Sequence, residues 1–265
     1  MNTSHNVLFV PHGAPTFALR PGAVGAAMSR VAQQLQTPRA IIVVSPHWET
    51  AQPTVGTATK LETIHDFYGF DPALYSLSYP ATGCPEAARE VVKALQAHGL
   101  SVAEDDRRGL DHGAWAPLRQ MFPDADIPVV PVSVQSHAGP AHALRVGQAL
   151  RDLVTQGFLL IASGNITHNL GDWRVAHQTG GSTPAYVNRF ADWIHEQLLR
   201  HDVDALLDYR RQSADGVRAH PSDEHLLPLF TALGAAGEAA QAQPFYRGVS
   251  DYVIAMDGYQ FIERA

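Results

Sequence analysis

Three apolar runs in this chain each end at a histidine, and this arrangement constrains the fold more than any other feature. The runs are 7–10, 40–44 and 158–162, and they lead to His12, His47 and His168. Short runs rich in β-branched and aliphatic residues are typical of strands buried in a parallel sheet. In an open α/β sheet, ligands bind in the crevice outside the carboxyl ends of the strands. The pattern therefore predicts that the three histidines converge at one edge of a central sheet.

The remaining periodicity predicts an α/β fold with a single domain over residues 1–265. We expect a central, mostly parallel or mixed sheet flanked by helices, with a metal site at the carboxyl ends of its strands. Turn and capping signals predict helices at 23–35, 85–97, 140–155, 184–199 and 222–233. A further strand is predicted at 128–134, where the prolines indicate an edge or a bulge. Residues 246–255 and 259–262 are predicted to form a terminal hairpin around Asp257-Gly258.

Charge and cysteine content exclude several classes of partner. The 265 residues carry a formal net charge of −7 and no run of Lys or Arg, which argues against nucleic acid or an anionic membrane as a partner. Cys84 is the only cysteine, so no internal disulfide and no thiolate zinc cluster is expected. No signal peptide or membrane span is recognisable, and we expect a cytoplasmic location. No Gly-x-Gly-x-x-Gly follows a strand, so no dinucleotide cofactor is predicted.

Two other segments supply candidate site residues. Around residue 225, Ser222 is a good helix N-cap, and His225 would lie in the first turn of a helix that points into the same crevice. Glu224 is the rival ligand, because a carboxylate would complete the triad of two histidines and one carboxylate common in non-haem iron oxygenases. His112 lies between glycines in the segment 109–118, where a backbone can approach a ligand closely, although it could equally cap the following helix.

Taken together, these segments resemble the class III extradiol dioxygenases, in particular the branch of the DOPA 4,5-dioxygenases. The matching stretches are 11–15, 45–48, 110–113, 163–170 and 220–225, which follow one another in the order of the family. The resemblance implies a non-haem Fe(II) centre and insertion of both atoms of O2 beside the two hydroxyls of a catechol. It also implies Zn(II) as an alternative occupant in purified or crystallised protein.

Carried over by position, the resemblance assigns a role to each of the five histidines. His12, His47 and His225 look like the metal ligands, and His225 is favoured over Glu224 because this branch has a histidine there. His168 looks like the acid–base residue, close enough to serve as a fourth ligand of zinc. His112 looks like a hydrogen-bond donor beside the substrate.

Substrate contacts are less specific in the sequence. His65 and His220 are candidates to bind a substrate carboxylate, and Trp48 is a candidate to frame the aromatic ring. The partners expected are a DOPA-like catechol and O2, with a homo-oligomer as a further option.

Two other functions fit the same residues. Three histidines and a water also form the zinc site of a hydrolase, which would keep its activity with zinc and without O2. A non-catalytic protein on this scaffold could use the pocket for metal binding or for an interaction. The presence of both His112 and His168 argues against a pure binding role, which needs no acid–base residues.

Overall fold

Four parallel strands form the centre of the sheet, and the histidines predicted to converge lie at their carboxyl ends. The computed structural model describes residues 6–263. The central strands run in the order β5 (Val129–Val134), β2 (Ala40–Glu49), β6 (Phe158–Gly164) and β1 (Val7–Pro11). Nearly all of their residues are buried, as expected for strands that are covered on both faces.

Shorter and antiparallel strands complete this sheet on both sides. Beyond β5 lie β3 (Thr54–Gly56) and β4 (Ala103–Asp105), and beyond β1 lie β10 (Gly258–Glu263) and β7 (Ala240–Tyr246). β10 pairs antiparallel with both of its neighbours, and β3 pairs antiparallel with β5. The sheet is therefore mixed, and the predicted α/β class with flanking helices is confirmed.

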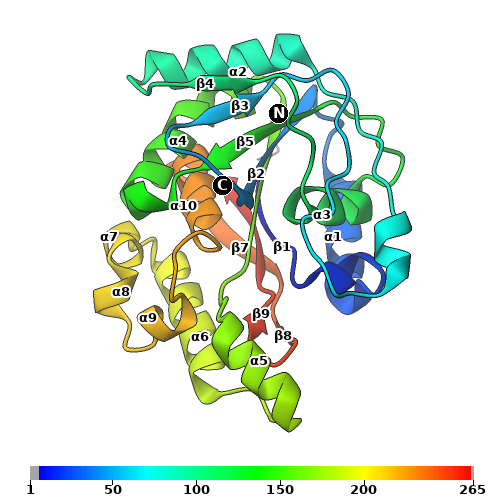
Figure 1. Cartoon of the computed structure of the whole chain (residues 1–265). Helices are drawn as coiled ribbons and strands as arrows, with labels where there is room; N and C mark the ends of the chain where they lie inside the picture. The colour runs from blue at the N-terminus through cyan, green and yellow to red at the C-terminus, as the bar shows by residue number, and fades with distance from the viewer. Residues whose placement is uncertain (1–5, 264–265) are drawn as a thin grey trace.

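Helices cover both faces of the sheet (Figure 1). On one side, α1 (Gly22–Gln34) packs against α3 (His112–Met121), and α3 contacts β2 and β6. On the other side, α4 (Gly139–Thr155) and α10 (Leu227–Ala236) pack together and against β6, with α2 (Pro85–Ala97) beside α4. The site histidines thus lie between α3 and the segment that precedes α10.

A second group of helices lies beyond the carboxyl ends of the central strands, in the lower part of Figure 1. It comprises α5 (Leu170–Thr179), α6 (Ala185–Arg200), α7 (Val203–Leu207), α8 (Tyr209–Gln212) and α9 (Gly216–Ala219). The two-stranded sheet of β8 (Val249–Ser250) and β9 (Ile254–Ala255) lies beside α6. Within residues 6–263, no helix combines the length and apolar character needed to cross a membrane.

Two of the predicted strands differ from the structure. β5 is an interior strand rather than an edge: on the side away from β2, Val132 pairs with Val55 of β3 and Val129 pairs with Gly83. The alternative of a bulge agrees with an irregularity in the pairing of β2 with β5, whose register shifts between Val44 and Glu49. The predicted terminal hairpin is also wrong, because β10 pairs with β7 and not with residues 249–255. Asp251 and Tyr252 have positive φ angles of 48° and 65°, which break that stretch into a turn.

The predicted helix at 222–233 begins later than expected. α10 starts at Leu227 and carries Pro228 in its first turn, where the missing N–H costs nothing. A helix that began at Ser222 would place this proline in its interior and lose a hydrogen bond. His225 consequently lies in the turn before α10 and not in its first helical turn.

Candidate metal centre

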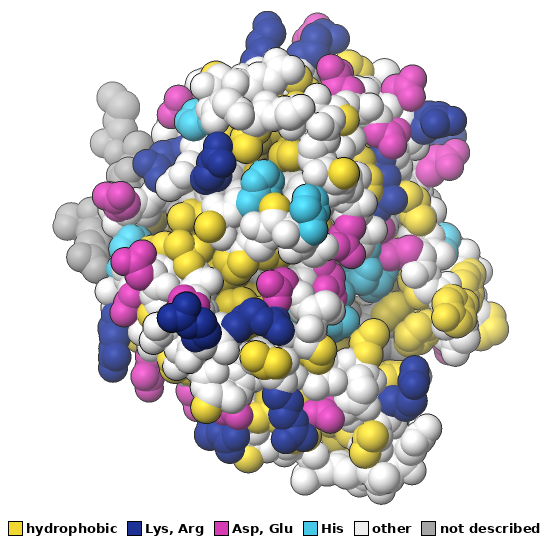
Figure 2. Space-filling model, turned by 60° about the vertical axis from the view of Figure 1, so that its left-hand side comes forward, with side chains coloured by type: hydrophobic (Ala, Val, Ile, Leu, Met, Phe, Trp, Pro, Cys, Tyr) yellow, Lys and Arg dark blue, Asp and Glu magenta, His cyan; other side chains and the backbone are white. Residues whose placement is uncertain are grey.

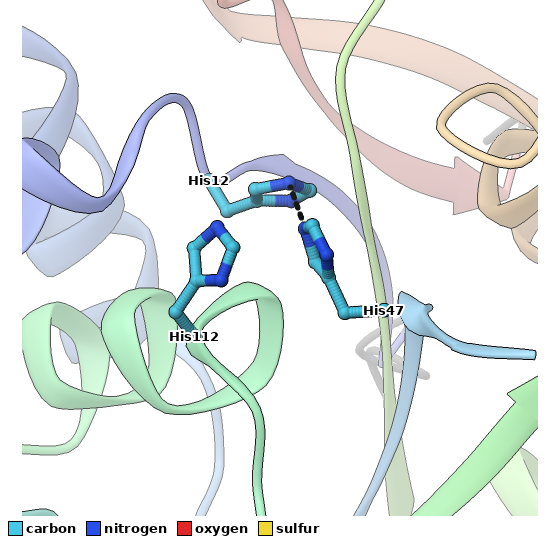
Figure 3. A group of neighbouring side chains, drawn as sticks. All are labelled: His12, His47 and His112. Atoms are coloured by element: carbon cyan, nitrogen blue, oxygen red, sulfur yellow. Dashed lines mark hydrogen bonds between the residues drawn. The ribbon is translucent and has the colours of Figure 1, made fainter. Parts of the chain in front are cut away.

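Three histidine rings from three different elements point toward one another (Figure 3). His12 follows β1, His47 lies near the end of β2, and His112 is the first residue of α3. The Nε2 atoms of His12 and His47 are 3.2 Å apart, and one ligand nitrogen from each of the three residues lies within 4.8 Å of the others. This spacing matches three imidazoles gathered around one metal ion.

A second group of potential ligands lies beside the first. It contains His168, Glu224 and His225, whose ligand atoms are also within 4.8 Å of one another. The His225 ring centroid lies 5.3 Å from that of His12 and 5.0 Å from that of His47. His168 stacks on His225 at 3.4 Å between centroids. The five histidines predicted to bind the metal, transfer protons or donate to the substrate therefore lie in one cluster.

Hydrogen bonds set the tautomer of His12. Ser163 donates its hydroxyl proton to the carbonyl oxygen of Gly113, so this hydroxyl accepts from Nδ1–H of His12 at 2.9 Å. Asn165 accepts from the N–H of Gly13 through Oδ1 and therefore turns its amide NH2 toward Nε2 of His12. Both contacts leave the lone pair of His12 on Nε2, the atom that faces His47.

Carboxylates orient the other rings in the same way. Asp66 accepts from the N–H and from Nδ1 of His112 at 2.8 and 2.9 Å, and its Oδ2 lies 3.5 Å from Nδ1 of His47. Glu224 lies 3.0 Å from Nδ1 of His225. These contacts engage Nδ1 of His112 and of His225 and leave their Nε2 atoms free of the carboxylates.

Burial keeps four imidazoles of the cluster neutral. Burial, with a smaller effect of His112, lowers the pKa of His47 to about 4. Burial and then His220 lower the pKa of His168 to about 3. The pKa values of His12 and His225 are lowered well below the usual range, first by burial and then by neighbouring histidines. Neutral imidazoles are the form that binds metal ions.

The carboxylate of Asp66, in contrast, is held in its charged form. Burial alone would raise its pKa, but the hydrogen bonds and charge of His112 outweigh this effect and lower the pKa to about 2.

These residues fit a divalent metal ion. The Nε2 atoms of His12 and His47 lie 3.2 Å apart, and a cation beside them could take a lone pair from each. Nitrogen-rich sites of this kind suit both iron and zinc.

A cavity of about 780 Å³ opens over the cluster. His47, His112, His168 and His225 form its polar floor, and aromatic and aliphatic side chains form much of its wall. On the face shown in Figure 2, histidine side chains are visible in a hollow, with acidic and hydrophobic side chains beside them. The site is thus accessible to a small molecule that carries an apolar ring.

The three predicted substrate contacts are placed elsewhere. Among the described residues, those that line this cavity do not include His65, His220 or Trp48. His220 is fully buried with Nε2 on the carbonyl oxygen of Ile166, and His65 bonds to the carbonyl oxygen of Leu77. Trp48 is buried beneath the guanidinium of Arg108, 5.1 Å from its ring. Burial keeps His220 and Trp48 out of the cavity, and Nε2 of His65 is engaged by the backbone.

Sequence reasoning missed the residues that orient the ligands. Asp66, Ser163 and Asn165 make the hydrogen bonds described above, yet each lies in a loop or strand end without a periodic pattern. The polar run at the end of β6 was a usable signal, because Ser163 near the end of this buried strand and Asn165 just after it lie at the edge of the sheet where ligands bind. Asp66 comes from a loop distant in sequence from both of its partners, and no local pattern points to it.

Comparisons with known proteins agree with this geometry. Residues 22–255 match the family model described as "Catalytic LigB subunit of aromatic ring-opening dioxygenase". The chain is 36% identical over 263 residues to the 4,5-DOPA dioxygenase extradiol of Beta vulgaris, with 96% of this chain and 95% of the relative covered. It is 35% identical over 241 residues to the protein of the same name in Escherichia coli K12, with 88% and 86% covered.

A solved structure shows the same fold. The crystal structure of an uncharacterized protein from Escherichia coli K12 superposes with a TM-score of 0.78 at 29% identity, covering 95% of this chain and 97% of that one.

Proposed function

Because the chain belongs to the family of the catalytic LigB subunit of aromatic ring-opening dioxygenases, we propose that it opens the ring of a DOPA-like catechol with O2. Membership of this family makes the chain a non-haem, metal-dependent extradiol dioxygenase. The convergence of neutral histidines on the floor of an open cavity supports the choice of substrate class most directly.

We propose His12, His47 and His225 as the metal ligands. Their Nδ1 atoms face Ser163, Asp66 and Glu224, which leaves each Nε2 available. Glu224 is the weaker candidate because it already lies 3.0 Å from Nδ1 of His225. A carboxylate in this position orients a ligand histidine and makes it more basic.

Fe(II) is the metal proposed for activity, and Zn(II) is an alternative occupant without redox chemistry. When bound, Fe(II) would supply Lewis acidity toward the catechol oxygens and a redox-active centre through which electrons of the catechol reach O2.

His168 is proposed as the acid–base residue. Its ring is buried and neutral, with a pKa lowered to about 3 by burial and by His220, so it can accept a proton from a catechol hydroxyl. Its ring stacks on that of His225 with 3.4 Å between the centroids, which supports a position beside the proposed ligands. The same ring can return this proton to an oxygen atom of the ring-opened product, which is otherwise left negatively charged.

His112 is proposed to donate a hydrogen bond to the substrate. Its Nδ1–H is held by Asp66, and its ring lies 4.1 Å from that of His47 between centroids. Nε2, the ring nitrogen that Asp66 does not engage, is the atom from which this hydrogen bond would be donated. Such a donor would stabilise negative charge that develops on oxygen during the reaction.

The experiment that tests this function is anaerobic loading of the apoprotein with Fe(II), followed by exposure to air with a panel of catechols that includes DOPA. A yellow ring-opened product with O2 uptake only in the iron form is expected. Absence of colour and of uptake with every catechol, despite bound iron, would contradict the proposal. Zinc-loaded protein is the control, since a hydrolase would be active with zinc.

Other predictions about partners remain sequence-based. The net charge of −7 supports the proposal that neither nucleic acid nor an anionic membrane is a partner. A homo-oligomeric state and a cytoplasmic location stay predictions.

A further inference from the structure

The cavity over the histidine cluster has an uneven distribution of charge. The charged side chains that line it, apart from histidine, are the carboxylates of Glu49 and Glu224. Among the described residues, no Lys or Arg belongs to this lining. The guanidinium of Arg108 is engaged outside it, 2.6 Å from Oδ2 of Asp111 and over the ring of Trp48. A substrate in this cavity therefore meets negative charge without a balancing cation from the protein.

Glu49 is the carboxylate available to a ligand. Glu224 is occupied by the Nδ1 of His225 at 3.0 Å, whereas the partner of Glu49 is the hydroxyl of Ser136, which also lines the cavity. No Lys or Arg of the described chain forms an ion pair with Glu49. An exposed carboxylate of this kind can pair with a cation on a ligand.

Strand geometry places Glu49 at a useful distance from the reacting centre. Glu49 and His47 lie two residues apart in β2, and both line the cavity. The backbone advances roughly 7 Å over two residues of a strand. A two-carbon arm on a catechol ring bound at His47 covers a similar length, and its end would lie near the Glu49 carboxylate.

The size of the cavity leaves room for such an arm. Its volume of about 780 Å³ falls within the usual range for sites that bind whole small molecules, roughly 300–1,000 Å³. Phe67, Phe70, Leu170 and Trp173 line the wall, which suits the ring and the methylene groups of the arm.

We propose that the substrate is a catechol whose side arm ends in an ammonium group, and that Glu49 is the residue that selects it. This inference rests on the proposed ring-opening activity and specifies its substrate. A catechol whose arm ends only in a carboxylate is disfavoured, because it would bring a third negative charge into a cavity that offers no lysine or arginine. DOPA carries both an ammonium group and a carboxylate. We therefore expect a higher kcat/KM for the amine that lacks this carboxylate than for DOPA.

The test compares three catechols that differ only in the end of a two-carbon arm: an amine, an alcohol and a carboxylate. The iron-loaded protein is assayed at a pH near 8, where exposed histidines are neutral. We expect kcat/KM to be highest for the amine and about tenfold lower for the carboxylate, with the alcohol between them. Dissociation constants of the same compounds, measured without O2, are expected to follow the same order.

The variant Glu49→Gln tests whether the carboxylate of Glu49 causes the preference for the amine. It is expected to lower the amine-to-alcohol ratio of kcat/KM by about threefold to fivefold. The matched control is Glu104→Gln, which removes an exposed carboxylate from the edge strand β4, away from the cavity, and is expected to leave this ratio unchanged. Because ratios are compared, a general loss of activity in the variant does not affect the result.

Two outcomes overturn the inference and separate it from the proposed function. Turnover of all three compounds with the carboxylate preferred, or an unchanged ratio in Glu49→Gln, contradicts selection by Glu49 while ring opening stands. Absence of turnover of any catechol contradicts the proposed function itself.

Discussion

The carboxylate of Asp66 accepts two hydrogen bonds from His112, one from its backbone N–H at 2.8 Å and one from Nδ1 at 2.9 Å. The same carboxylate lies 3.5 Å from Nδ1 of His47. One loop residue thus orients both a proposed metal ligand and the proposed hydrogen-bond donor. Groups in this position commonly contribute tenfold to a hundredfold to metal affinity or activity.

Replacing Asp66 should therefore weaken the site without removing a ligand. We expect Asp66→Ala to lower kcat/KM by about 10-fold to 100-fold and to weaken metal binding in the same direction. Asp66→Asn keeps one acceptor oxygen, so its kcat/KM should lie between those of the unchanged protein and of Asp66→Ala. Asp71→Asn is the control, since Asp71 caps the short helix that follows on the same segment. Unchanged kinetics in Asp66→Ala would contradict the role.

Metal binding tests the ligand set. Alanine at His12, His47 or His225 should each abolish tight binding of one divalent metal per chain, measured by metal analysis after dialysis. His98→Ala should bind normally, because this exposed side chain bonds to the carbonyl oxygen of Ala94 at the end of α2. If His225→Ala bound metal normally and Glu224→Gln did not, the carboxylate would be the third ligand.

His168 should separate chemistry from metal binding. We expect His168→Ala to retain the metal while kcat falls by about 10²- to 10⁴-fold, the usual range for loss of an acid–base residue. Stopped-flow spectra of bound catechol would show slower deprotonation of the substrate. Loss of metal together with activity would instead make His168 a ligand.

The stability of the apoprotein should fall in mild acid. The buried histidines have lowered pKa values in the fold, about 4 for His47 and about 3 for His168, and ordinary values near 6.5 when unfolded. Above pH 6.5 these histidines are unprotonated in both the folded and the unfolded state, so they do not make the free energy of unfolding depend on pH. Below pH 6.5 these histidines bind protons in the unfolded state but not in the folded state, so the free energy of unfolding decreases as the pH falls.

The size of this effect is up to about 1.4 kcal/mol per pH unit for each such histidine. Urea unfolding of metal-free protein between pH 7 and pH 5 should show it, with a shallower dependence in His168→Gln. His98→Gln should behave like the unchanged protein. A midpoint independent of pH in this range would show that these imidazoles are not kept neutral by the fold.

The strands and their histidines could be predicted because their signal is local. The runs that became β1, β2 and β6 are continuous and apolar, and three such strands adjacent in a sheet deliver His12, His47 and His168 to one edge. The prediction of the helix start near His225 is wrong because it relies on Ser222 as the N-cap, whereas α10 begins at Leu227 with Pro228 in its first turn.

Contacts between segments that are distant in sequence could not be predicted from local sequence patterns. The pairing of β10 with β7 depends on the turn at Asp251 and Tyr252 and on Asp257, whose carboxylate accepts from Gly248 N–H and Arg247. Asp66 reaches His112 across 46 positions of sequence. Neither relationship leaves a periodic pattern in the chain.

The central claim is that both atoms of O2 enter the product at this histidine site. The most direct measurement is single turnover of the iron-loaded protein with a catechol in isotopically labelled O2, with the product trapped at once because an aldehyde oxygen exchanges with water. Mass spectrometry should show both labelled atoms in one ring-opened product, and one O2 consumed for each ring. A product without label, or ring opening that proceeds without O2, would contradict the dioxygenase function.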